Sequence, residues 1–312
     1  MRTIRALSAA AIGASLVALA ACGSSSNPTD AGAGGGSGVP TSKAATDTIV
    51  VGSANFSENV VLADIYADAL KAKGVKVSTK LNIGSRETYI PALKDGSIDL
   101  IPEYSGVLLQ YLDKNATAES SADVFAALQK AVASPLTVLD QSAAEDKDAI
   151  VVTKETASKY NLKSIADLAA VADKLTLGAP PEFQTRSDGI PGLKKVYNVT
   201  FKTYRKLDAG GPLTENALKN GQIDAGDIFT TDPLIAKNGW VVLDDPKSLY
   251  TAQNVLPLIN ASKASDNVKS ILNAVSAKLT TDDLVALNEK VQIEKQDPDK
   301  VAQAWLSTAG LS

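Results

Sequence analysis

The stretch GSRETYIPALKDGSIDLIPEYSG, Gly84–Gly106, contains a segment that occurs twice in the chain. Its central part, ALKDGSID at Ala92–Asp99, reappears 125 residues later as ALKNGQID at Ala217–Asp224, with six of the eight positions identical. Tyr104 and Phe229 stand at equivalent places just beyond the strand that each copy begins. A single duplication predicts two related lobes rather than a solenoid, which needs several repeats. We therefore expect a ligand to bind between two lobes.

The residues around each copy are patterned alike. Short apolar runs rich in β-branched residues alternate with segments in which apolar residues keep helical spacing. The order strand, helix, strand, helix, strand is typical of a mostly parallel sheet flanked by helices, so the predicted fold class is α/β. The predicted strands are 48–51, 75–81 and 98–101 in the first unit and 175–177, 199–207 and 223–229 in the second, with helices from Ser57, after Ser85, over 189–197 and after Pro212.

Two further apolar β-type runs, AIVVT at 149–153 and WVVL at 240–243, lie where the chain would pass from one lobe to the other. Two crossing strands would form a hinge of few residues. The strand and helices that follow are expected to return to the first lobe. The predicted boundaries are 47–148 for the first part of lobe 1, 149–243 for lobe 2 and 244–312 for the return to lobe 1.

The beginning of the chain has the pattern of a bacterial secretion signal. Basic residues are followed by an apolar run, and LAAC at Leu19–Cys22 resembles a lipoprotein box. We expect a signal peptide over 1–21, a lipid on Cys22, which is the single cysteine, and a flexible tether over 22–46, where large apolar side chains are rare. The alternative is a soluble secreted protein cleaved at an A-x-A-like site. The first interpretation predicts an extracytoplasmic protein anchored to the cell membrane.

Composition excludes several classes of function. The formal net charge is −4, and no run of Lys and Arg indicates nucleic-acid binding. The chain has no histidine, which excludes Ser-His-Asp catalysis and histidine metal sites, and it has no GxxxxGK[ST] motif for ATP. The carboxylate pairs at 145–146 and 244–245 are interpreted as solvated turn residues. We expect neither an enzyme nor a metal or cofactor, and ATP hydrolysis should belong to a partner.

Five fragments, taken in order and spacing, give the chain from Ile49 onward its resemblance to a known family. They are GSANFSE at 52–58, GS before a helix at 84–85, IDLIPEYSG at 98–106, EFQTRSDG at 182–189 and IFTTDPLI at 228–235. Together they resemble the substrate-binding lipoproteins of osmoprotectant ABC importers, the glycine betaine, carnitine and choline binders of ProX/OpuC type. The resemblance implies a two-lobed periplasmic-binding-protein fold of type II, a ligand in the cleft between the lobes, and a monomer that docks on a permease with a cytoplasmic ATPase.

The same resemblance implies roles for three residues. Tyr104 in PEYSG matches a tyrosine of the aromatic cage, Arg186 in EFQTRSDG matches the arginine that binds the ligand carboxylate, and Phe229 lies close to another cage position. These roles suit the chemistry of a betaine. A quaternary ammonium has no hydrogen to donate and is best bound by aromatic faces, whereas a carboxylate favours the fork of an arginine.

The chain departs from the family pattern where further ligand contacts are expected. The departures are Ala54 in place of a lysine, Val107 in place of a threonine, and non-aromatic residues at Ala149 and Gln253. Other groups could compensate: Arg86 and Tyr89 follow a predicted helix start, and Thr231 and Asp232 follow a strand end. A larger polyhydroxylated or aromatic ligand, a zwitterion held differently, and a sensor that does not transport therefore remain alternatives.

Overall fold

The structure, a computed structural model of the chain, describes residues 47–312. The predicted signal peptide, Cys22 and the predicted tether lie outside the described residues. None of the helices in 47–312 combines the length and the apolar character needed to cross a bilayer.

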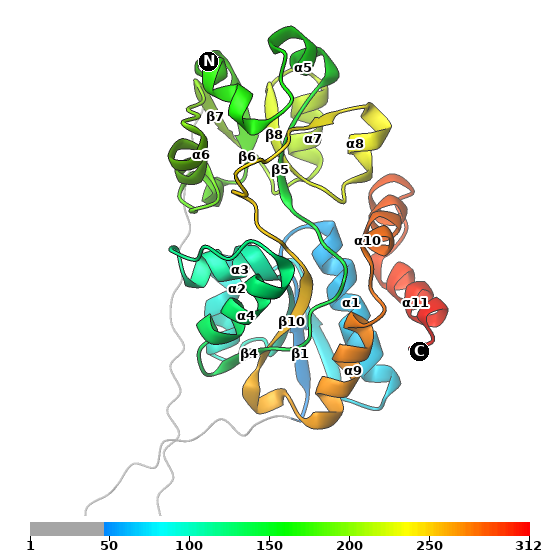
Figure 1. Cartoon of the computed structure of the whole chain (residues 1–312). Helices are drawn as coiled ribbons and strands as arrows, with labels where there is room; N and C mark the ends of the chain where they lie inside the picture. The colour runs from blue at the N-terminus through cyan, green and yellow to red at the C-terminus, as the bar shows by residue number, and fades with distance from the viewer. Residues whose placement is uncertain (1–46) are drawn as a thin grey trace, which may run out of the picture. The chain divides into compact units, whose positions relative to one another are not determined.

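Two five-stranded mixed sheets form the centres of two lobes (Figure 1). The strand order is β2-β1-β3-β10-β4 in lobe 1 and β7-β6-β8-β5-β9 in lobe 2. In each sheet the first three strands are parallel, and the fourth, β10 or β5, runs antiparallel to its neighbours. The strands are β1 (Ile49–Gly52), β2 (Val77–Lys80), β3 (Leu100–Tyr104), β4 (Leu136–Val138), β5 (Asp148–Val152), β6 (Thr176–Ala179), β7 (Thr203–Lys206), β8 (Ala225–Phe229), β9 (Val241–Val242) and β10 (Val255–Asn260).

Helices cover both faces of each sheet, and their apolar side chains form a separate core on each face. In lobe 1, α1 with α9 to α11 packs on one face and α2 to α4 on the other, as Figure 1 shows. The helices of lobe 1 are α1 (Ser57–Ala72), α2 (Arg86–Lys94), α3 (Ser105–Leu112), α4 (Ser121–Ala131), α9 (Asp266–Ser276), α10 (Thr281–Asn288), the π-turn η5 (Glu289–Ile293) and α11 (Pro298–Ala309). Those of lobe 2 are α5 (Lys154–Tyr160), α6 (Ile190–Tyr197), α7 (Pro212–Lys219), α8 (Pro233–Asn238) and the 3₁₀ turns η1 (Ile165–Ala170), η2 (Ala172–Lys174) and η3 (Pro181–Gln184). A further 3₁₀ turn, η4 (Ala261–Lys263), follows β10.

The sequence repeat corresponds to a structural repeat. Its two copies form α2 with the turn into β3 and α7 with the turn into β8. The aspartate that ends each copy has the same role, because the Asp99 carboxylate accepts a hydrogen bond from the backbone N–H of Val50 at 2.9 Å and the Asp224 carboxylate accepts one from Thr176 at 2.8 Å. Each aspartate therefore ties the turn after its helix to the middle one of the three parallel strands in its lobe, β1 or β6.

The two runs expected to cross between the lobes differ from the prediction. β5 and β9 both lie in the sheet of lobe 2, where they pair antiparallel with each other, and β5 also pairs with β8 along its whole length. The chain crosses beside these strands, through 139–147 and 243–254, where Glu145 and Asn254 form an isolated antiparallel bridge. The physical reason is that an apolar strand must pair its backbone groups, and the lobe 2 sheet offers that pairing.

The register of the fourth strands places the cleft aromatics next to the crossings. Tyr104, the last residue of β3, is paired with Val255, the first residue of β10. Phe229, the last residue of β8, is paired with Asp148, the first residue of β5. In both lobes, therefore, the residue that ends the third strand lies beside the point where the chain arrives from the other lobe.

Candidate functional site

A cleft lies between the two lobes, at the ends of β3 and β8. Protein atoms leave about 580 Å³ of empty space there, a volume that includes open solvent at the mouth of the cleft. Sites at the carboxyl ends of strands are usual in open α/β sheets. Lobe 1 contributes Ala54, Phe56, Arg86, Tyr89, Tyr104 and Val107, lobe 2 contributes Glu182, Arg186, Asp227 and Phe229, and the crossing segments and their ends contribute Asp146, Asp148 and Gln253.

Aromatic rings from both lobes meet in the cleft. The ring of Phe56 lies 5.0 Å from that of Phe229 and 6.0 Å from that of Tyr104, measured between centroids, with interplanar angles of 45° and 33°. Phe56 and Tyr104 belong to lobe 1 and Phe229 to lobe 2. The prediction included Tyr104 and Phe229 but missed Phe56, although the motif GSANFSE contains this aromatic in the short connection between β1 and α1.

The hydroxyl of Tyr104 is held by a buried glutamate. It donates to Glu58 Oε1 at 2.7 Å, and Glu58 Oε2 accepts from the Thr231 hydroxyl at 2.6 Å and from Asn288 Nδ2 at 2.7 Å. Burial raises the pKa of Glu58, against the lowering effect of these hydrogen bonds. Because Thr231 lies in lobe 2 and Glu58 in lobe 1, this cluster joins the two lobes behind the rings.

Thr231 and Asp232 lie beside the cleft rather than on its wall. Thr231 is 1% exposed, and its backbone N–H donates to Asp146 Oδ1 at 3.0 Å. Asp232 begins helix α8, where its carboxylate accepts from the N–H of Leu234 at 2.7 Å. Both residues line a second cavity that adjoins the first at Phe56 and Phe229. Ligand contact by Thr231 and Asp232 stays a prediction.

Arg86 and Tyr89 line the cleft and share a carboxylate partner. Arg86 Nε and Nη2 donate to the two oxygens of Glu103, both at 2.7 Å, and the Tyr89 hydroxyl donates to Glu103 Oε1 at 2.9 Å. All three residues are buried. Glu103 was missed by the prediction, although it precedes Tyr104 in the motif IDLIPEYSG. The sequence alone does not show that the side chain of Glu103 faces that of Arg86.

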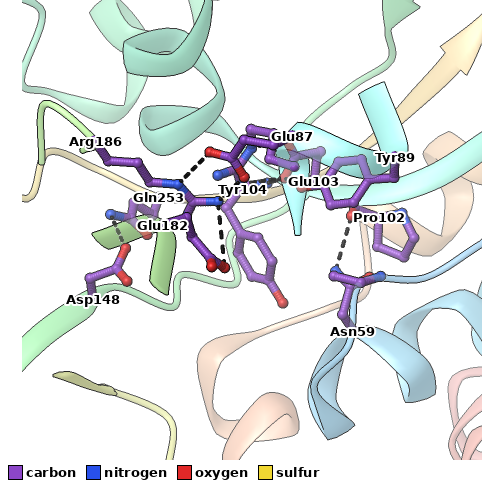
Figure 2. Close-up of polar contacts among 12 residues, drawn as sticks. Asn59, Glu87, Tyr89, Pro102, Glu103, Tyr104, Asp148, Glu182, Arg186 and Gln253 are labelled. Atoms are coloured by element: carbon purple, nitrogen blue, oxygen red, sulfur yellow. Dashed lines mark hydrogen bonds and ion pairs between the residues drawn. The ribbon is translucent and has the colours of Figure 1, made fainter. Parts of the chain in front are cut away.

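Arg186 forms an ion pair across the cleft, as Figure 2 shows. Its Nε and Nη2 donate to the two oxygens of Glu87 at 3.0 and 2.9 Å, and the Glu182 carboxylate lies 4.0 Å away. Although burial alone raises it, the hydrogen bonds and charge of Arg186 bring the pKa of Glu87 down to about 2. Glu87 lies in the first turn of α2 in lobe 1, so this pair also joins the lobes. Ligand contact by Arg186 stays a prediction.

Three aspartates that were not predicted to contact the ligand, Asp146, Asp148 and Asp227, line the cleft. Burial raises the pKa of Asp146 and of Asp227 well above the usual range, and it raises the pKa of Asp148 to about 6. The interpretation of Asp146 as a solvated turn residue is wrong, because Asp146 is 3% exposed. It is buried where the chain crosses between lobes, and the backbone N–H of Thr231 and the hydroxyl of Thr230 donate to it.

Three of the four departures from the family pattern lie on the cleft wall. Ala54 and Val107 replace polar side chains there, and Gln253 approaches Asp148 Oδ2 with its amide at 3.4 Å. Ala149 is instead buried in the core of lobe 2. Across residues 47–312, no group of three or more Cys, Asp or Glu side chains is arranged to hold a metal ion.

Comparison with known proteins gives relatives along most of the chain. The glycine-betaine-binding protein of Pseudomonas aeruginosa is 27% identical over 84% of this chain and 88% of its own. The carnitine transport binding protein OpuCC of Listeria monocytogenes is 26% identical over 83% and 86%. A solved structure of a glycine betaine/carnitine/choline ABC transporter is 25% identical, with a TM-score of 0.66, over 84% of this chain and 99% of that one.

These likenesses confirm the predicted fold class, a two-lobed periplasmic-binding-protein fold of type II. A family model described as the substrate binding domain of an ABC-type glycine betaine transport system matches residues 47–308. The match includes both lobes, both crossings and the helices that follow β10. The chain therefore belongs to the OpuAC family of ABC transporter substrate-binding proteins.

Proposed function

We propose that this protein is the extracytoplasmic receptor of an ABC importer and that it binds a quaternary ammonium osmolyte between its lobes. The observation that carries the proposal is the meeting of Phe56, Tyr104 and Phe229 in the cleft. A methylated ammonium offers no hydrogen bond, and aromatic faces attract its diffuse charge by roughly 0.5–2 kcal/mol each, more when water is excluded. Rings from both lobes would surround such a group when the lobes close.

Closure of the lobes is the step that would couple binding to transport. The cluster around Glu58 and the Arg186–Glu87 pair both bridge the lobes, so they stabilise a closed arrangement. A ligand that contacts both walls binds the closed state better than the open one. It therefore shifts the equilibrium between the open and closed states further toward the closed state. The closed form would then be presented to a permease, whose ATPase supplies the energy.

Two further residues are proposed for the ligand's polar end. Arg186 and Arg86 line the cleft, and an oxygen at the ligand's polar end could accept a hydrogen bond from either guanidinium in place of part of its contact with Glu87 or Glu103. We also propose a lipid on Cys22, supported by the sequence LAAC, which would hold the receptor near its permease. The receptor would act as a monomer.

Calorimetric titration of the purified protein tests the proposal directly. Glycine betaine, choline, carnitine and proline betaine share a quaternary ammonium and differ in the rest of the molecule. At least one should give a saturable binding heat and raise the melting temperature, since a ligand at 100 times its Kd stabilises by about 2.7 kcal/mol. Absence of both effects with all four at millimolar concentration would overturn the quaternary-ammonium assignment.

A further inference from the structure

Asp227 is a buried cleft residue with an unpartnered oxygen. It precedes Phe229 by two positions in β8, so the two side chains lie on the same face of the sheet, and both line the cleft. Asp227 is 1% exposed, and its Oδ1 has no hydrogen-bond partner among residues 47–312. A buried acceptor left without a donor costs about 1–3 kcal/mol. A ligand group that donates to this oxygen would remove that cost.

The surroundings of Asp227 make this wall of the cleft acidic. Burial and neighbouring carboxylates raise its pKa well above the usual range. Asp148 faces it from β5, Asp188 from the loop before α6, and Glu182 from η3, while Arg186 supplies an opposing positive charge. The hydroxyl of Tyr250, which is buried near the same carboxylates, also lacks a hydrogen-bond partner within the described part of the chain. A cation or a hydrogen-bond donor placed here would favour the ionised form of Asp227, because it opposes the burial and carboxylate repulsion that raise the pKa.

The two guanidinium groups of the cleft are already bound to carboxylates. Arg86 is held by both oxygens of Glu103, and Arg186 by both oxygens of Glu87. A ligand carboxylate would have to displace one of these bidentate pairs and would also lie near the acidic wall. A ligand donor, in contrast, meets an acceptor that is unoccupied in the described structure.

We propose that Asp227, supported by Asp148, forms a subsite that accepts a hydrogen bond from the second end of the ligand. The ligand's quaternary ammonium would lie against the aromatic rings, and its second end would be a hydroxyl or an amine rather than a carboxylate. The ligand class is then a quaternary ammonium alcohol or amine. This inference rests on the proposed function, which it narrows from quaternary ammonium compounds in general to those without an acid group.

Choline and glycine betaine form a matched pair of probes, because both carry a trimethylammonium group and they differ in a hydroxymethyl against a carboxylate. For the unmodified protein, calorimetry should show choline binding about tenfold or more tightly than glycine betaine, as expected for a hydrogen bond to a charged group. Asp227→Asn keeps the shape and removes the charge. This variant should bind choline more weakly and glycine betaine more tightly than the unmodified protein does. The two affinities should then lie within about threefold of each other.

Asp188→Asn is the control, since it removes a charge that acts on Asp227 from a residue that does not line the cleft. It should leave the ratio of the two affinities within about twofold of the unmodified protein. If Asp227→Asn gives no cooperative thermal transition, Asp148→Asn takes its place, because Asp148 is in the cleft and supports the same subsite.

The outcomes distinguish failure of the subsite from failure of the proposed function. An unchanged ratio in Asp227→Asn, or glycine betaine binding the unmodified protein as tightly as choline, overturns the subsite and leaves the proposed function intact. An equal loss of choline selectivity in Asp188→Asn and in Asp227→Asn also overturns the subsite. The selectivity would then come from the net negative charge near the cleft and not from a hydrogen bond to Asp227. Binding of no quaternary ammonium compound overturns the proposed function, and the subsite with it.

Discussion

At the scale of single residues, Phe56 is the centre of the aromatic group because it touches one ring from each lobe. It lies in extended conformation immediately before α1, so its backbone belongs to lobe 1 while its ring reaches Phe229 of lobe 2. A cation that enters between these rings would separate them and gain contact with each face. The rings therefore contribute to binding and to the contact between lobes at the same time.

Replacement of Phe229 by leucine separates the contribution of the aromatic face from that of apolar bulk. Phe229→Leu should lower affinity for the preferred quaternary ammonium ligand by about two- to thirtyfold, because a cation–π contact of roughly 0.5–2 kcal/mol is lost. Phe201→Leu is the matched control, since Phe201 packs against the lobe 2 core and does not line the cleft. Calorimetry measures both variants. Equal affinities in Phe229→Leu and the unmodified protein would show that the ring is not part of the site.

At the scale of elements, the first turn of α2 makes two ion pairs in different directions. Arg86 points to Glu103 within lobe 1, whereas Glu87, the next residue, points to Arg186 in lobe 2. One helix start therefore supports the cleft wall and also joins the lobes. The two pairs differ in burial, since Glu103 is 1% exposed and Glu87 is 43% exposed at the side chain. Water screens the second pair more strongly, so it is the weaker of the two and the easier to open.

Removal of the charge on Glu87 should weaken closure without disturbing either lobe. Glu87→Gln is expected to lower ligand affinity by about two- to fivefold, which corresponds to the 0.5–1 kcal/mol typical of a partly exposed pair. Glu182→Gln is the control, because Glu182 approaches the same guanidinium from within lobe 2. Small-angle scattering should show a larger open fraction for Glu87→Gln alone. Identical behaviour of the two variants would contradict a role of this pair in closure.

The contribution of the Glu87–Arg186 ion pair to the stability of the protein should decrease at low pH. The pKa of Glu87 is lowered from 4.5 to about 2, so its contribution to stability is present above pH 4.5 and is lost as the pH falls through about 2. Between pH 4.5 and 2 the difference in melting temperature between the unmodified protein and Glu87→Gln should therefore shrink. A difference that grows as the pH falls would show that Glu87 is not stabilised by Arg186.

The elements that sequence reasoning recovered are those with a repeated or periodic signal. The duplicated helix, turn and strand were recognised because Asp99 and Asp224 perform the same structural task and are retained in both copies. The prediction did not include helices α3 and α4; α3 begins at Ser105, directly after the last residue of β3, with no connecting segment to mark its start. It also could not show that Asp227 and Phe56 face one cleft, because that depends on how two lobes separated in sequence come together.

At the scale of the whole molecule, attachment to the membrane would confine the receptor to a volume close to its permease. A short flexible tether holds a binding partner at millimolar effective concentration, so even weak docking would be frequent. The predicted lipid on Cys22 and the tether that follows it lie outside the described residues. The anchor can be tested by a substitution at Cys22 that leaves both lobes unchanged.

Substitution of the cysteine should release the protein from the membrane. Cys22→Ala is expected to abolish the incorporation of labelled fatty acid. In a detergent phase-partitioning experiment it should move the protein from the detergent phase to the aqueous phase. Ser24→Ala, two residues further along, should behave as the unmodified protein. Unmodified protein found in the aqueous phase would support the alternative of a soluble secreted form.

The pairing of Tyr104 with Val255 and of Phe229 with Asp148 has a mechanical consequence. Each cleft aromatic is joined by a strand ladder to the end of a crossing segment, so the ligand position lies near the axis about which the lobes would turn. A rotation about that axis would displace the rings less than it displaces groups farther from the crossing segments. A small adjustment of the rings around a methylated ammonium would therefore accompany a larger displacement at the surface that a permease can contact.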